Sequence, residues 1–138
     1  MTDDSDVAFT LAEMSITSHA RSLFASGFHR DAIRHEAQDL LAEIADRSGR
    51  DDLNGQSLVQ SVLADDKPSL AFNERQTAKE RNEHASLRYL MLGVTTGVRN
   101  IYSHDVRSIV PRDEAALWLL LMSRLRQQIE RLDNVSEA

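Results

Sequence analysis

The chain has no cysteine and no long apolar run, and each absence excludes a class of protein. Without cysteine it cannot form a disulfide, a thiolate metal site or a cysteine nucleophile. No apolar run approaches the roughly 18 to 20 residues of a membrane-spanning helix. Residues 1–6, MTDDSD, are acidic, whereas a signal peptide begins with basic residues. We therefore expect a soluble, cytoplasmic protein that does not enter a membrane.

Basic charge is also scarce. The 138 residues carry 16 Lys and Arg against 22 Asp and Glu, a formal net charge of −6. A broad nucleic-acid surface usually appears as a basic domain, so the composition argues against one. A protein that engages a single phosphate needs only a local basic patch. Arg88, Arg99 and Arg107 are the candidates for such a patch.

Strand-like alternation, internal repeats, Gly-rich phosphate loops and paired metal motifs are all missing. Apolar residues instead recur at spacings of three and four, which predicts an all-α fold. We expect main helices over residues 10–26, 29–48, 72–101 and 112–132, and a short extra helix around residues 58–63. The prediction is an antiparallel four-helix bundle forming a single domain over residues 9–133. Residues 1–8 are expected to be a disordered acidic lead and residues 134–138 a tail.

The last predicted helix is apolar on every side over residues 115–122, AALWLLLM. Such a helix is either central or packed against two partners, and a small four-helix bundle has no central helix. We therefore expect a second contact surface, most simply an isologous homodimer.

The strongest functional pattern is residues 97–105, GVRNIYSHD, where the apolar periodicity stops. Arg99 offers a planar fork of donors that matches phosphate oxygens, and Asn100 adds an amide donor. His104, with an ordinary imidazole pKa of about 6.5, can exchange a proton near neutrality. Residues five apart in one helix lie about 140° apart around its axis, so we expect the helix to end or bend between Arg99 and His104. The alternative is a solvated helix end without catalytic function.

Two other polar patterns are interpreted as structural. Residues 30–35, RDAIRH, repeat the Arg and His spacing, but they lie within uninterrupted helical periodicity that points the two side chains apart. His29 and His35 have no partner at metal-ligand spacing and are expected on the surface. His84 lies in a polar segment that is expected to be a solvated helix or a loop, and it has no ligand set either. We expect no metal site and no cofactor.

Two residues are candidates for a supporting role near the motif. Glu36 lies at the margin of an apolar stripe, where a carboxylate is usually a shallow boundary residue. If it faces the cleft, it would orient Arg99 or His104. Tyr102 could stack a base, although an aromatic residue at helical spacing more often belongs to the core.

Arg99-Asn100-x-x-x-His104 resembles the Arg, polar residue, spacer and His motif of the HEPN superfamily, small helical domains many of which are metal-independent endoribonucleases. The setting is similar to the Ymh-type branch, in which a Gly-x-Arg-Asn element precedes a His and an acidic residue. Here these residues are Gly97, Arg99, Asn100, His104 and Asp105. The resemblance extends from about residue 16 to about residue 132, and implies dimers whose two motifs face one cleft.

The sequence departs from that branch at Ile101, where proline is common. The resemblance implies an endoribonuclease that cleaves RNA through attack of the 2′-hydroxyl, and a role as a toxin or phage-defence effector with a possible antitoxin or sensor partner. His104 would be the general base or acid, Arg99 would stabilise phosphoryl charge, and Asp105 and Arg107 would support them. The alternatives are a non-catalytic HEPN-like nucleotide-binding or dimerisation module, which the acidic composition favours, and a purely structural helical subunit.

Overall fold

The structure is a computed structural model that describes residues 13–104 and 109–134, with the side chains at 99–101, 103, 104, 133 and 134 outside the description. This part of the chain contains five helices: α2 (Ser18–Ala25), α3 (His29–Ser48), α4 (Gly55–Val62), α5 (Ala78–His104) and α6 (Arg112–Ile129). Strands β1 (Leu70–Ala71) and β2 (Asp133–Asn134) form a two-residue antiparallel ladder. The predicted all-α class is confirmed, with this ladder added. None of the described helices combines the length and apolar character needed to cross a membrane.

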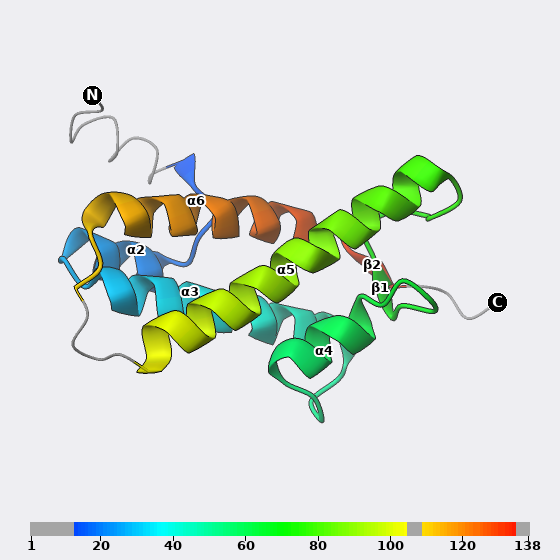
Figure 1. The fold of residues 1–138 in the computed structure, drawn as a ribbon, viewed down its shortest axis with the longest axis horizontal. Helices are drawn as coiled ribbons and strands as arrows, with labels where there is room; N and C mark the ends of the chain where they lie inside the picture. The colour runs from blue at the N-terminus through cyan, green and yellow to red at the C-terminus, as the bar shows by residue number, and fades with distance from the viewer. Residues whose placement is uncertain (1–12, 105–108, 135–138) are drawn as a thin grey trace.

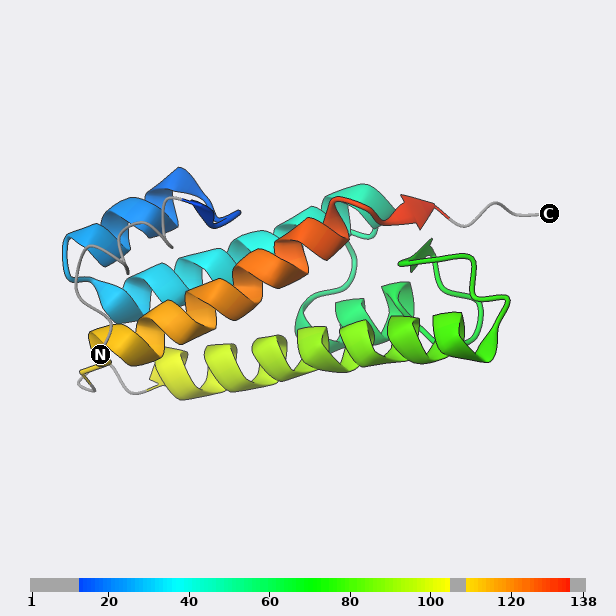
Figure 2. The ribbon, with the colours of Figure 1, turned by 90° about the horizontal axis from the view of Figure 1, so that it is seen from above.

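The central helix is α3, which contacts α2, α4, α5 and α6. Figure 1 shows α3 and α6 side by side and running in the same direction, with α5 crossing them in the opposite direction. Seen from above, α2 and α5 lie on opposite sides of the α3 and α6 pair, and α4 lies against α5 (Figure 2). The described helices thus comprise three long ones and two of eight residues, so the expected bundle of four main helices is not confirmed.

Helix α3 begins and ends where the sequence predicted. Its apolar stripe faces the neighbouring helices and is fully buried at Ala32, Ile33, Leu40 and Ile44. Gly49 follows the last turn in the left-handed region, at φ 70°, and its N–H bonds back to the carbonyls of the helix end. Glycine adopts this conformation without steric cost, which explains why the helix ends here.

The first predicted helix differs from the structure in its start. Within the described residues, α2 begins at Ser18, and residues 15–17 precede it without helical structure. Thr17 is the N-cap, with its Oγ1 accepting a hydrogen bond from the N–H of Ala20 at 3.1 Å. Met14 and Ile16 are still buried, so their apolar pattern predicted burial correctly but not helix.

The start of α5 also differs from the prediction, at Ala78 rather than residue 72. Thr77 and Glu80 form a capping box, in which Thr77 Oγ1 accepts from Glu80 N and Glu80 Oε1 accepts from Thr77 N, both at 3.1 Å. These two hydrogen bonds satisfy donors that a helix leaves unpaired, and they fix the first turn.

His84 is the most unexpected polar residue of α5. We predicted a solvated or loop position, but the side chain is buried. Its Nδ1 accepts from the N–H of Phe72 at 3.4 Å, so Nε2 carries the proton that it donates to the carbonyl of Leu63 at 2.9 Å. Through these hydrogen bonds, His84 links the segment between α4 and β1 to α5.

Candidate functional site

The motif lies in the last turns of α5, which continues through His104. The helix does not end between Arg99 and His104, so the expectation of a helix end there is wrong. In a regular helix their backbone positions are about 140° apart around the axis. Helix α5 continues through this segment because Val98 and Tyr102 are buried. Their packing outweighs the low helix propensity of Gly97 and Ile101. The side chains of Arg99, Asn100 and His104 lie outside the described part, as do Asp105 and Arg107 entirely.

Tyr102 is a core residue with 4% of its surface exposed. Its ring meets Trp118 of α6 edge to face, with 6.2 Å between the ring centroids. The core alternative is therefore correct for this residue, and the exposed base-stacking face that we considered is not present. Burial raises the pKa of the Tyr102 phenol, and the negative charge of Glu114 raises it further.

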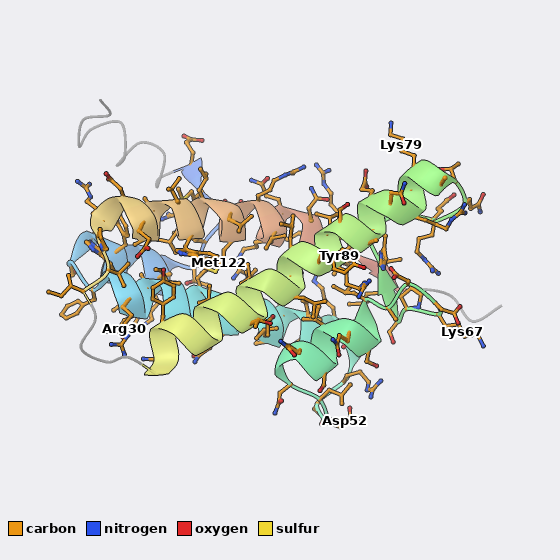
Figure 3. All side chains as sticks on the ribbon, viewed as in Figure 1. Arg30, Asp52, Lys67, Lys79, Tyr89 and Met122 are labelled. Carbon is orange, nitrogen blue, oxygen red and sulfur yellow. The ribbon has the colours of Figure 1, made fainter. Side chains whose placement is uncertain are left out.

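Two neighbouring residues at the start of α3 hold the chain on both sides of the α5–α6 connection. Arg30 Nε donates to the backbone carbonyl of Tyr102 at 2.7 Å, and Figure 3 shows Arg30 beside the end of α5. His29 Nδ1 lies 3.1 Å from the carbonyl of Val110, and because a carbonyl only accepts, Nδ1 carries the proton. A cation at the carbonyl end of a helix also complements its dipole.

These contacts agree with the prediction that Arg30 and His35 point apart. Arg30 contacts the last turn of α5. His29 is half-buried rather than a surface residue. His35 does not join Arg30, and its ring instead meets that of His19 in α2, with centroids 4.4 Å apart. The pair at this spacing is therefore not a second motif.

A cleft of about 620 Å³ opens beside these contacts, lined by residues 27–31 and 109–112. Arg30, Arg112 and His29 line it, and Asp31 is the acidic residue among its described lining. The Arg112 guanidinium also lies over the ring of Phe24, 5.9 Å from the centroid. This basic cleft is at the same end of the molecule as residues 99–104.

The composition of the local basic patch differs from the prediction. Arg88 is about 16 Å along the helix axis from Arg99 at 1.5 Å per residue, too far to join it. Its Nη2 bonds to Asp65 at 2.8 Å, and its guanidinium lies over the ring of Tyr89. Among the described residues, the arginines that line the cleft near the end of α5 are Arg30 and Arg112, at the start of α3 and α6, and Arg88 is not one of them.

Glu36 is fully buried, so its assignment as a shallow boundary residue is wrong. Its Oε2 accepts from the N–H and hydroxyl of Thr17 at 3.0 and 3.1 Å. Its Oε1 accepts from Arg126 Nε and Nη2 at 2.9 and 2.7 Å, and Arg126 also bonds to Asp39 at 2.7 Å. Both oxygens therefore serve to join α3 to Thr17 and α6, which is a structural role.

The charge of Arg126 is stabilised by these partners. Burial lowers the pKa of its guanidinium, but the hydrogen bonds and charges of Glu36 and Asp39 more than compensate and raise the pKa above its ordinary value. Among the residues described, no group of three His, Cys, Asp or Glu side chains is arranged to hold a metal ion.

The raised pKa of Tyr102 makes the alkaline stability of the protein testable. Because the pKa of the Tyr102 phenol is higher in the folded than in the unfolded protein, its contribution to stability is fully present below the unfolded-state pKa of about 10. This contribution is lost as the pH rises through the folded-state pKa. We expect the free energy of unfolding to fall more steeply above about pH 10 in wild type than in Tyr102→Phe. Urea unfolding across this pH range measures both slopes. Tyr89→Phe, at an exposed position, is the matched control, and equal slopes in wild type and Tyr102→Phe would contradict the prediction.

The fold and site define a small, predominantly α-helical protein in which the C-terminal end of the long helix α5 lies beside a basic cleft. The chain belongs to the Hypoth_ymh family, described as a protein of unknown function, whose family model matches residues 11–129. This confirms the Ymh part of the resemblance. Comparison with curated proteins and with solved structures gave no match.

Proposed function

We propose that the protein is an endoribonuclease that cleaves RNA without a metal ion and acts as a homodimer of HEPN-like domains. His104 takes the proton of a ribose 2′-hydroxyl as the 2′-oxygen bonds to phosphorus and the bond to the 5′-oxygen breaks. Arg99 stabilises the charge that develops on the phosphoryl oxygens, and Asn100 holds the phosphate. The 5′-oxygen leaves with a proton from water, so each site requires one Arg99 and one His104.

The observation that carries the proposal is the position of residues 99–104 at the end of α5, beside the basic cleft. Arg30 holds the carbonyl of Tyr102 within this segment, and Arg30 and Arg112 both line the cleft. Their positive charges contribute to the local potential whatever else they bind, which favours an approaching phosphate in a protein whose net charge is −6.

A dimer would solve the geometric problem that the continuous helix creates. Because positions 99 and 104 are on different sides of α5, one protomer alone does not bring them together through its backbone. A twofold axis near the end of α5 would set Arg99 of one protomer against His104 of the other. Leu117 and Leu120 of α6, 68% and 46% exposed, are the candidate contact surface.

The experiment is RNA cleavage by the full chain in the presence of EDTA. A single-stranded RNA should be cut and leave a 2′,3′-cyclic phosphate and a 5′-hydroxyl, because the 2′-oxygen is the nucleophile. DNA of the same sequence and the 2′-O-methylated RNA are the matched controls and should remain intact. Cleavage of either control, or cleavage that requires added Mg²⁺, would contradict the mechanism.

A second candidate is a non-catalytic HEPN-like module that binds a nucleotide or dimerises with a partner. The acidic composition and the exposed leucines of α6 favour it. It predicts that wild type forms a dimer in sedimentation experiments that Leu117→Lys disrupts, while no RNA is cut under any condition. The role of a cytoplasmic toxin or phage-defence effector, with an antitoxin or sensor as partner, is an analogy with the superfamily.

A further inference from the structure

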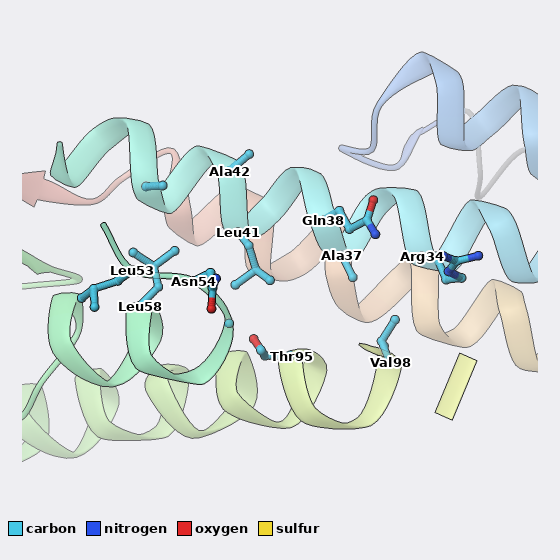
Figure 4. Close-up of a pocket in the computed structure, with 12 residues that line it drawn as sticks. Arg34, Ala37, Gln38, Leu41, Ala42, Leu53, Asn54, Leu58, Thr95 and Val98 are labelled. Atoms are coloured by element: carbon cyan, nitrogen blue, oxygen red, sulfur yellow. The ribbon is translucent and has the colours of Figure 1, made fainter. Parts of the chain in front are cut away.

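A second cavity lies between α3, α4 and α5, with a volume of 260 Å³ (Figure 4). One face of α3, from Arg34 to Ala45, forms its longest side, and Thr95 and Val98 of α5 lie opposite. The eleven steps from Arg34 to Ala45, at 1.5 Å each, make this side about 16 Å long. The cavity is therefore elongated along α3.

Most of this cavity is apolar. Ala37, Leu41, Leu53, Leu58 and Val98 line it, and small side chains on α3 leave the space between the helices open. The hydroxyl of Thr95 is engaged, since it donates to the carbonyl of Met91 at 2.8 Å. Ligand sites typically combine such an apolar lining with a few polar groups that fix orientation.

Arg34 supplies a polar group at one end of the cavity (Figure 4). It is the one charged side chain among the described lining residues. Its Nε is buried and has no hydrogen-bond partner among the residues that the structure describes. Its Nη1 lies 3.7 Å from Asp31, a half-exposed pair that is expected to be weak. A buried donor without an acceptor is unfavourable, so an anionic group at this end would supply what Arg34 lacks.

We propose that this cavity binds a small amphipathic anion, a carboxylate with an unbranched aliphatic chain, independently of the nuclease function proposed above. The carboxylate would bond to Arg34 and the chain would lie along α3 toward Leu53. An apolar cavity of about 150 Å³ accommodates the six carbons of benzene, so 260 Å³ corresponds to roughly ten carbons. A nucleobase fits less well, because the described lining has no aromatic ring on which a base could stack.

The test is calorimetric titration of the full chain with decanoate below its micelle-forming concentration, with decanol as the uncharged probe of equal length. Wild type should bind decanoate more tightly than decanol. Arg34→Gln should weaken decanoate binding about tenfold or more and leave decanol binding unchanged. Arg47→Gln is the matched control, because Arg47 is on the same helix as Arg34, has a similar exposure and lies outside the cavity. The Arg47→Gln variant should bind decanoate as wild type does.

Filling the cavity gives a second test that does not depend on charge. Leu41 is half-buried and points into the space in Figure 4, so Leu41→Trp should abolish binding of both probes. Ala37→Leu serves the same purpose if circular dichroism shows that the first variant does not fold. Equal binding of decanoate by wild type and Arg34→Gln would overturn the proposal. It would also be overturned if wild type does not bind decanoate, or if it binds adenosine monophosphate instead. The assay contains no RNA, so its failure is separate from a failure of the nuclease proposal.

Discussion

Replacing His104 with alanine is expected to slow RNA cleavage by about 10²- to 10⁴-fold, the usual contribution of a general acid or base. Arg99→Ala is expected to slow it by about 10²- to 10³-fold, because a donor to the transition-state charge is lost. Initial rates on a labelled RNA in EDTA measure both effects. His35→Ala is the matched control, since His35 occurs at the same spacing after an arginine but packs on His19. An unchanged rate in His104→Ala would contradict the catalytic assignment.

Mixing the two inactive variants tests whether the site is shared between protomers. If Arg99 of one protomer serves His104 of the other, a heterodimer contains one complete site and one that lacks both residues. Random exchange makes about half of the dimers heterodimers, so about a quarter of the wild-type activity should return. If each protomer uses its own pair, no heterodimer site is complete and the mixture should remain inactive.

Arg126→Ala is expected to lower the free energy of unfolding by about 3 to 5 kcal/mol. The reason is that Glu36 is fully buried and would lose the guanidinium that contacts its Oε1 at 2.7 Å. Since small domains are stable by only about 5 to 15 kcal/mol, such a loss takes a large part of the total. Urea unfolding followed by circular dichroism measures the change.

The control for this prediction is the ion pair between Arg47 and Glu43, which is 2.8 Å long and partly exposed on α3. Arg47→Ala should lower stability by no more than about 0.5 kcal/mol, as is usual for such i,i+4 pairs. Replacing both Glu36 and Arg126 with leucine should be milder than Arg126→Ala alone, because no charge then remains buried without a partner. Equal effects of Arg126→Ala and Arg47→Ala would contradict the role of burial.

The elements that the sequence predicted well are those that local patterns specify. The bounds of α3 followed from apolar periodicity and from Gly49, and the start of α6 followed from its acidic first turn. Thr77 and Glu80 carry a capping-box pattern that would have set the start of α5 correctly.

The residues that the sequence could not interpret have partners far along the chain. Glu36 binds Arg126, 90 residues away, and Arg30 binds the carbonyl of Tyr102, 72 residues away. Periodicity reports which face of a helix is apolar, but it does not identify which distant group will neutralise a buried charge. The motif at residues 99–104 was recognisable because its spacing is local, whereas the cleft beside it depends on the packing of α3 and α6.

The hydrogen bonds from His29 to Val110 and from Arg30 to Tyr102 affect how much the length of the connection between α5 and α6 can change. They fix the chain on either side of residues 103–109, so the helices stay in register whatever amino acids join them. Lengthening a connection between fixed ends adds little free energy, about 0.6 kcal/mol for each doubling. An insertion next to the motif should therefore leave the helical framework of this chain intact.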